Sequence, residues 1–304
     1  MARIVSGTEG IRETVAALRR GEVVGLPTET VYGLAADIRN ESALKKIFEV
    51  KGRPTSHPLI VHIADPEQLR EFAINVSAAC EALIRLCWPG PLTVIVTASP
   101  RVSRAITGGR DSVAVRLPAH PLAQTVIRDL GSPVAAPSAN RFGHVSPTTA
   151  QHVVKDLGND IGLVLDGGAC DVGVESTIVD CTLTSPEILR HGAITPEEIR
   201  QILGPQGPEV ALTTSGPSRA PGMMERHYAP RAKLVLHEND EPLPSDGAPI
   251  IRCDSNLVEV ARGLYDQLRH LDARHIPVAH VVLPAPSGLG YAIRDRLTKA
   301  AAGL

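Results

Sequence analysis

Four cationic side chains stand where predicted helices or strands end. Lys51 and Arg53 follow a predicted helix, and Arg116 and Arg190 each end an apolar extended run. The helix dipole alone would account for Lys51, but Arg53 lies past the helix on a segment stiffened by Pro54. An arginine fork matches phosphate or carboxylate oxygens, and a lysine supplies a point charge. These cations therefore predict a site for a small polyanion.

Short polar segments accompany the cations. Pro27–Leu34 directly follows a short apolar strand. In α/β proteins, ligand contacts commonly come from polar residues at the carboxyl ends of strands. Ala136–Asn140 and Ser146–Ala150 combine small residues with hydroxyl and amide groups. Asp166–Asp180 contains a glycine-rich loop ending in Ser-Thr, which could cradle an anion. Each segment alone is equally explained as a turn or a helix cap, so the prediction depends on their combination.

The sequence lacks the signatures of several catalytic classes. The glycine-rich loop has no Gly-Lys-Ser/Thr at Walker spacing, and no Gly-x-Gly-x-x-Gly or Gly-x-Ser-x-Gly is present. The cysteines form no CxxC pair and no zinc spacing, which favours reduced thiols: Cys80, Cys87, Cys170, Cys181 and Cys253. From the residues alone, the chain is a polyanion-binding protein with no assigned reaction.

Apolar periodicity predicts alternating helices and strands, which indicates an α/β fold. Helices are expected over residues 10–20, 42–50, 67–73, 78–86, 122–130, 148–157 and 196–203. Strands are expected over residues 22–26, 59–63, 92–97, 113–117, 133–136, 163–165 and 177–180. Thr148 is the expected cap of the helix that begins there.

The length of 304 residues predicts two domains. A first domain is expected over residues 1–205. Residues 206–231 are rich in Pro, Gly, Ser and Thr and predict a linker. Because residues 220–230 also carry Met, Arg, His and Tyr, the linker is expected to contact either a ligand or the first domain, and its closure as a lid is the corresponding hypothesis. A small α/β domain is expected over 232–304, with strands at 233–236, 249–253 and 278–283 and helices at 257–268 and 291–301.

Composition limits the partners and the compartment. The formal net charge is −2, so no broad attraction to nucleic acid is expected, although a local basic cleft remains compatible. No apolar signal segment stands at the N-terminus, and no apolar run approaches the ~20 residues that span a bilayer. We expect a cytoplasmic protein without membrane contact.

Five motifs in a fixed order resemble the Sua5/YrdC/YciO family in its two-domain form: PTETVYGL, KGRP, APSAN, ESTIVD and RHGAI. The resemblance implies a YrdC-like open twisted sheet with a large cationic cavity, plus a small Rossmann-like α/β domain. It implies a nucleotidyltransferase that forms threonylcarbamoyl-AMP and pyrophosphate from L-threonine, bicarbonate (or CO2) and ATP. The product would pass to downstream threonylcarbamoyl transferase proteins that modify adenosine 37 of tRNA, so tRNA would be an indirect partner.

The resemblance also implies roles for individual residues. Threonine contacts match Thr30, His62, Arg116, Ala136 and Ser176. ATP contacts match Arg53, His57, Ser112, Ser138, Ser146, Arg190 and Tyr228. Catalytic positions match Lys51, Arg53 and Asn140. Mg²⁺ is expected to enter with ATP, and no metal site built from protein side chains is assigned.

Three alternatives remain open. A module that binds double-stranded RNA or tRNA without catalysis is disfavoured by the charge of −2. A carbamoyl transferase for another acceptor would usually carry zinc-finger-like modules, which the cysteine spacing does not provide. An inactive regulatory homologue is disfavoured because the polar site positions are retained: Lys51, Arg53, Ser138, Asn140 and Ser176.

Overall fold

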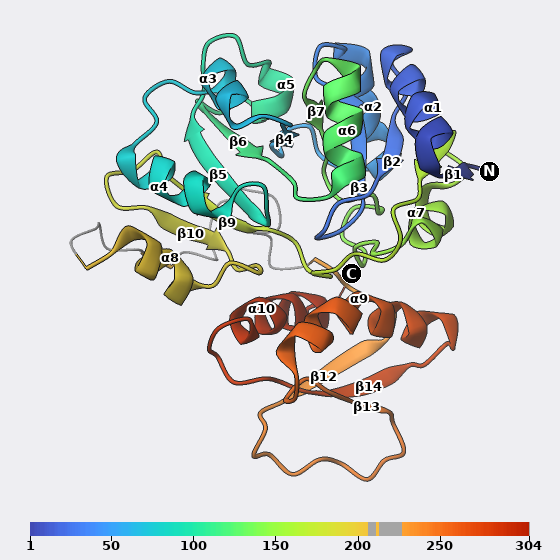
Figure 1. Cartoon of the computed structure of the whole chain (residues 1–304). Helices are drawn as coiled ribbons and strands as arrows, with labels where there is room; N and C mark the ends of the chain where they lie inside the picture. Colours follow the sequence, from blue (N-terminus) through green and yellow to red (C-terminus); the bar gives the residue numbers. More distant parts are fainter. Residues whose placement is uncertain (206–210, 213–226, 304) are drawn as a thin grey trace.

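The computed structural model describes residues 1–205, 211–212 and 227–303. Most of the expected linker or lid over 206–231 lies outside the described residues. The described part contains a large mixed sheet flanked by helices and a smaller parallel sheet with two helices of its own (Figure 1). The expected α/β fold with a large sheet and a small second α/β unit is confirmed.

The large sheet joins segments that are far apart in sequence, and its pairing is mixed. Its strands, in spatial order, are β1 (Arg3–Val5), β8 (Leu163–Leu165), β2 (Val24–Leu26), β3 (Gly33–Asp37), β7 (Val134–Ala135), β4 (Ile60–His62), β6 (Ser112–Arg116), β5 (Leu92–Thr97), β9 (Thr177–Asp180), β10 (Glu187–Arg190) and β11 (Ala211–Leu212). Strands β2 and β3 are antiparallel, whereas β4 and β6 are parallel.

Helices cover the two faces of this sheet unequally. They are α1 (Gly7–Arg19), α2 (Glu41–Lys51), α3 (Leu69–Phe72), α4 (Ala78–Cys87), α5 (Arg104–Thr107), α6 (Pro121–Leu130), α7 (Ala150–Leu157) and α8 (Pro196–Leu203). Helices α1 and α6 share one apolar cluster with β2, β3 and β8. Helices α2, α4 and α7 contribute to the larger cluster on the other face. On the α1/α6 side, the strands beyond β7 expose a face that holds the site described below.

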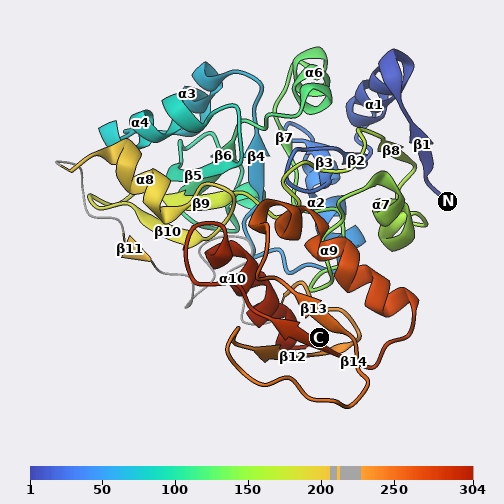
Figure 2. The same cartoon turned by 60° about the horizontal axis from the view of Figure 1, so that its bottom comes forward.

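The C-terminal part is a three-stranded parallel sheet in the order β12 (Lys233–His237), β14 (Val278–Val282), β13 (Ile250–Arg252). Helices α9 (Leu257–Ala273) and α10 (Gly290–Ala301) lie between this sheet and the first domain (Figures 1 and 2). They share an apolar cluster with Val31, Val145 and Val174 of the first domain. The two parts are therefore joined by a common core.

Three local expectations were wrong. Strand β3 was not expected, because its Gly-Leu-Ala-Ala sequence has neither β-branched residues nor a polar alternation. Helix α7 begins at Ala150, and its cap is Thr149, not Thr148, since the Thr149 hydroxyl accepts from the His152 amide. Strand β11 lies inside the segment expected to be a plain linker. Among the described residues, no helix is both long and apolar enough to cross a membrane.

Candidate active site

The central strands turn their polar side chains to one face of the sheet. Strand register pairs His62 of β4 with Arg116 of β6, and Arg116 with Thr93 of β5. Paired residues share a face because side chains alternate along each strand. Ile60 and Ala114 lie on this face as well, and belong to a small apolar cluster. Alternation along the strands thus places polar and apolar side chains next to one another on the same face.

A pocket of about 540 Å³, including its space open to solvent, lies over this face. It brings together nine residues assigned from the sequence: Thr30, Arg53, His62, Arg116, Ala136, Ser138, Ser176, Arg190 and Tyr228. Its other lining residues are Thr28, Val31, Gly33, Ile60, Pro137, Glu175 and His227. Within the described residues, this lining carries three arginines against one carboxylate, which favours an anionic ligand.

Arg116 is buried and held on three sides. Its Nη1 donates to Thr30 Oγ1 at 2.8 Å, its Nε donates to the Gly90 carbonyl at 3.3 Å, and Nη2 lies 2.7 Å from Glu29 Oε1. Burial acts to raise the pKa of Glu29, but the charge and hydrogen bonding of Arg116 outweigh it, so the pKa is lowered. Glu29 therefore orients the guanidinium and balances its charge, a role that the sequence did not assign.

A chain of hydroxyls fixes the turn between β2 and β3. Thr28 Oγ1 donates to the Val31 carbonyl at 2.6 Å and lies 2.9 Å from Thr30 Oγ1. Since Thr30 Oγ1 accepts from Arg116, its own proton points to Thr28. Hydrogen bonds in series polarise one another, so this turn presents Thr30 to the pocket in a single orientation.

His62 is a neutral imidazole with a defined tautomer. Burial, followed by the nearby charge of Arg116, lowers its pKa to about 3. Its Nδ1 lies 3.2 Å from the Ile60 carbonyl oxygen, which can only accept, so Nδ1 carries the proton. The lone pair on Nε2 is left as a hydrogen-bond acceptor.

Ser176 joins the predicted threonine contacts to the predicted ATP contacts. Its hydroxyl lies 2.8 Å from Thr93 Oγ1 and accepts from Arg190 Nη2 at 3.0 Å. Arg190 Nε donates to the Ser176 carbonyl at 3.0 Å. Arg190 is fully buried at the end of β10, so its charge is directed at the pocket from within the protein.

Arg53 reaches the pocket because α2 ends sharply. Gly52 adopts φ +64°, and the Arg53 amide then donates to the Phe48 carbonyl at 3.0 Å, which is a glycine-based helix stop. The guanidinium donates to the Pro58 carbonyl at 3.0 Å. Burial lowers its pKa to about 10, so it remains charged near neutral pH. Its cation therefore lines the same pocket as that of Arg116.

Lys51 and Asn140 lie beneath the pocket rather than in its lining. The Lys51 ammonium donates to the carbonyls of Ser138 at 2.5 Å and Asn140 at 2.6 Å. Asn140 Nδ2 donates to the Arg141 carbonyl at 2.8 Å and the His144 carbonyl at 2.7 Å. These two residues, assigned to catalysis from the sequence, shape the loop that presents Ser138.

Three further assigned residues also lie outside the lining. Ser146 is fully buried and donates to Glu175 Oε1 at 2.6 Å. His57 is half-buried with its ring 5.4 Å from that of Phe142. Ser112 starts β6 opposite Thr97. Their assignment as direct ATP contacts stays a prediction.

His227 and Tyr228 close one side of the pocket from the chain that follows the linker. Their rings are 4.0 Å apart, and the Tyr228 ring stacks on Tyr265 of α9 at 5.7 Å. The next residue, Ala229, donates its amide to the Gly143 carbonyl at 3.0 Å. Residues 220–226 of the same motif lie outside the described residues.

Three lining side chains keep buried polar atoms that form no hydrogen bond with the described residues: Arg53 Nε, His227 Nδ1 and Tyr228 Oη. Such orphaned atoms are rare in folded proteins because each loses its hydration without compensation. Their convergence on one pocket indicates that a polar ligand supplies the missing partners.

Residues that the assignment missed belong to motifs that the sequence had singled out. Thr28, Glu29 and Val31 lie in Pro27–Leu34, while Glu175 directly precedes Ser176. Their proximity to assigned residues was the available signal.

A metal ion would find no side-chain cage in the described residues. No group of three or more His, Cys, Asp or Glu side chains is arranged to hold one. The one carboxylate of the lining, Glu175, already accepts from Ser146, Tyr265 and Arg296. This donor set fits a Mg²⁺ that is held by phosphate oxygens and water rather than by protein.

Two family models cover most of the chain. The model for Sua5, YciO and YrdC proteins, described as "Telomere recombination", matches residues 16–192. The model described as "Threonylcarbamoyl-AMP synthase, C-terminal domain" matches residues 194–302.

Relatives match over nearly their full length. Threonylcarbamoyl-AMP synthase of Pyrococcus abyssi is 39% identical, covering 95% of this chain and 93% of the relative. The Bacillus subtilis protein of the same name is also 39% identical, over 96% of this chain and 93% of the relative.

Solved structures of family members superpose on this chain. P. abyssi Sua5 complexed with L-threonine superposes with a TM-score of 0.90 and 38% identity, covering 99% of this chain and 98% of that chain. Escherichia coli YciO, at 22% identity and a TM-score of 0.56, shares the fold over 63% of this chain and 96% of its own. The chain therefore belongs to the Sua5/YciO/YrdC family and has the two-part architecture of its Sua5 members.

Proposed function

We propose that this protein joins L-threonine, bicarbonate and ATP into threonylcarbamoyl-AMP, with release of pyrophosphate. The observation that carries the proposal is the convergence of three buried arginines and three orphaned polar atoms on one pocket. Two related enzymes are named for this product, and a homologous structure is described as a complex with L-threonine.

Threonine is held at the Arg116 end of the pocket. The Arg116 guanidinium, which Glu29 orients, donates to the threonine carboxylate, while Thr30 and Ser176 offer hydroxyls. Ala136 and Ile60 supply apolar surface for the threonine methyl group. One methyl group is worth about 1–3 kcal/mol, so discrimination against serine is roughly 10- to 200-fold.

His62 supports formation of the carbamate. The threonine ammonium must release a proton to solvent before the amine adds to bicarbonate or CO2, and the neutral Nε2 of His62 accepts a hydrogen bond from the amine and orients it. Addition to bicarbonate gives the N-carboxylate and one water molecule. Since the imidazole has a pKa of about 3, it stays neutral throughout the physiological range.

ATP is held at the Arg53 and Arg190 end. A carbamate oxygen attacks the α-phosphorus, the bond to the bridging oxygen breaks, and pyrophosphate leaves. The protein contributes positioning and charge stabilisation, without a covalent intermediate. Mg²⁺ bound to ATP would supply further positive charge beside the phosphate groups, in addition to that of Arg53 and Arg190. Tyr228 and Ser138 offer hydroxyls beside the arginines.

The product has a defined fate in this proposal. Threonylcarbamoyl-AMP is a mixed anhydride that serves downstream threonylcarbamoyl transferase proteins, which modify adenosine 37 of tRNA. We place this chemistry in the cytoplasm, where ATP, bicarbonate and tRNA are all present.

The test is pyrophosphate release with ATP, bicarbonate and each amino acid in turn. Release should depend on threonine and fall in CO2-depleted buffer, and the adenylate should be detected by mass spectrometry. Release without threonine, or no release at all, would reject the proposal. The alternative of an RNA-binding module is not favoured, because the cations are buried in one pocket rather than spread over a surface. Salt-dependent RNA binding without ATP turnover would support that alternative.

A further inference from the structure

Arg296 of α10 carries a guanidinium from the C-terminal part into the wall of the pocket. It is the largest of the fully buried side chains, with no exposed surface. Its Nε donates to Glu175 Oε2 at 2.7 Å, and its Nη2 donates to the His191 carbonyl at 2.8 Å. Nη1 pairs with its neighbour Asp295. One side chain thus connects α10 to two separate segments of the first domain.

The two segments that Arg296 holds are those that carry assigned site residues. Glu175 directly precedes Ser176, and His191 directly follows Arg190. Gly192 packs so tightly here that an added Cβ would lie 2.2 Å from the Thr177 amide nitrogen. A shift of either segment therefore displaces the other, and with it the hydroxyl and the guanidinium that face the pocket.

The same guanidinium also holds the third component of the pocket wall. Its Cζ lies 5.0 Å from the centre of the Tyr228 ring, within the range of a cation–π contact. Tyr228 stacks on Tyr265, and the Tyr265 hydroxyl donates to Glu175 Oε2 at 2.7 Å. Glu175, Tyr228 and Tyr265 therefore surround Arg296 as one buried network.

The charge of Glu175 depends on this network. Burial acts to raise the pKa of its carboxyl, but the charges of Arg296 and Arg190, and the hydrogen bonds from Ser146 and Arg296, lower it to about 2. A buried ion pair is often no more stabilising than an apolar pair of the same volume. If Arg296 only held the two parts together, apolar residues would do so equally well. Such residues already pack between the parts in the cluster that Val31 and Val174 share with α9 and α10.

We infer that Arg296 is a positioning residue for the reaction: the C-terminal part sets the spacing of Ser176, Arg190 and Tyr228 through a buried network with this guanidinium at its centre. The inference rests on the proposed function, because its readout is the handling of threonine and ATP. It predicts that the C-terminal part completes the catalytic pocket and is more than an appended domain.

Four variants of the full chain test this inference. Arg296→Lys keeps a charge beside Glu175 but cannot reach Glu175 and His191 together with a fork. The double variant Glu175→Gln/Arg296→Met removes both charges of this ion pair, so neither partner is left as an unpaired buried charge. The single variant Glu175→Gln is the reference for the double variant. Arg262→Gln is the matched control. Arg262 also crosses from α9 to the first domain, where its Nε donates to the Asp171 carbonyl at 2.9 Å, but it lies outside the pocket lining.

The measurements are KM and kcat for threonine and for ATP, together with the thermal midpoint of each variant. We expect kcat/KM for both substrates to be about 100-fold lower in Arg296→Lys than in the unmodified protein, since small displacements of reacting groups cost about this much. The double variant should show a similar loss when it is compared with Glu175→Gln. Arg262→Gln should retain wild-type kinetics, whatever its thermal midpoint.

Wild-type kinetics in both folded Arg296 variants would overturn the inference. So would a loss in Arg262→Gln as large as in Arg296→Lys, because domain docking would then explain the effect. Absence of threonine-dependent pyrophosphate release in the unmodified protein is a separate result, which would reject the proposed function itself.

Discussion

At the scale of single residues, the pocket is defined by polar atoms that the folded chain leaves unpaired. Tyr228 shows this clearly: its ring is buried between Tyr265 and Arg296, while its hydroxyl forms no hydrogen bond within the described part of the chain. Burial raises its pKa, so the phenol stays protonated and is available as a donor. The neighbouring Tyr265 hydroxyl, in contrast, is satisfied by Glu175.

Replacing these two tyrosines by phenylalanine should have opposite consequences. Tyr228→Phe removes an unpaired buried hydroxyl, so the free energy of unfolding should stay unchanged or rise by about 1 kcal/mol, while KM for ATP rises roughly tenfold. Tyr265→Phe removes a hydrogen bond to a carboxylate and should lower the free energy of unfolding by about 1.5–3 kcal/mol. Urea titration and pyrophosphate release at varied ATP measure both effects. A destabilised Tyr228→Phe with an unchanged KM would contradict this role.

At the scale of elements, α2 supports the loop between β7 and α7. Lys51 in the last turn of α2 donates to the carbonyls of Ser138 and Asn140. Burial, followed by the charge of Arg53, lowers the pKa of Lys51 well below its usual range. The contacts of this lysine are therefore with the backbone of the loop, and Arg53 alone carries the charge of the KGRP motif into the pocket.

Lys51→Met should accordingly act through the loop. It leaves two carbonyls without their donor, so the free energy of unfolding should fall by about 1–3 kcal/mol. KM for ATP should rise roughly tenfold as Ser138 moves. Lys45→Met, at an exposed position of the same helix, should change neither quantity. Lost activity at unchanged stability would instead mean that Lys51 contacts ATP directly.

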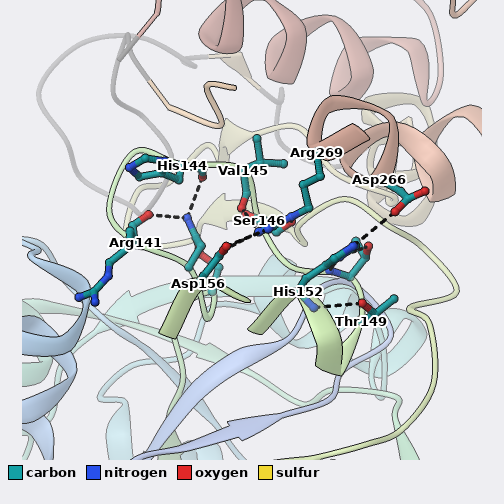
Figure 3. A network of polar contacts seen from close by, with 12 residues as sticks. Arg141, His144, Val145, Ser146, Thr149, His152, Asp156, Asp266 and Arg269 are labelled. Carbon is teal, nitrogen blue, oxygen red and sulfur yellow. Dashed lines mark hydrogen bonds and ion pairs between the residues drawn. The ribbon is translucent and has the colours of Figure 1, made fainter. Parts of the chain in front are cut away.

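At the scale of the whole molecule, a second buried network ties the two parts together. Arg269 of α9 donates to Asp156 of α7 at 2.6 and 2.9 Å and to the carbonyls of Val145 and Ser146, as Figure 3 shows. Ser146 in turn donates to Glu175. Together with the shared apolar cluster, these contacts predict that the two parts unfold as one unit.

Acid should destabilise the protein before its carboxylates titrate. Burial lowers the pKa of both His62 and His227 to about 3, whereas an unfolded histidine has a pKa of about 6.5. Between these values the unfolded state binds more protons, so stability is lost as the pH falls through this window, by up to about 1.4 kcal/mol per pH unit for each histidine. Glu175, with a pKa of about 2, adds a further loss below pH 4.5.

Urea unfolding at pH 7.5, 6.0 and 5.0 measures this dependence. His227→Phe should reduce the slope between pH 6 and 5 by up to about 1.4 kcal/mol per pH unit, because one neutral buried imidazole is gone. An unchanged slope would show that His227 is accessible to protons in the folded state.

The sequence by itself was sufficient to predict most helices and strands and to identify the motifs that line the pocket. Apolar periodicity and helix stops are local, so α2, β5 and α8 lie within a residue or two of their expected ranges. It failed where local signals are weak, as in β3, whose partners β2 and β7 decide its conformation. The same limit applied to the α7 cap, where two adjacent threonines are equivalent in sequence.

Only the tertiary structure decided which side chains reach the pocket. Lys51 shares a motif with Arg53, yet its ammonium donates to the loop carbonyls, and the Ser146 hydroxyl donates to Glu175. Arg296 stands 121 residues after Glu175 and carries no motif of its own, yet it contacts the wall of the site. The sequence determines residue types and the local helix and strand patterns. Hydrogen-bond partners, in contrast, depend on distances that arise only when separate segments pack.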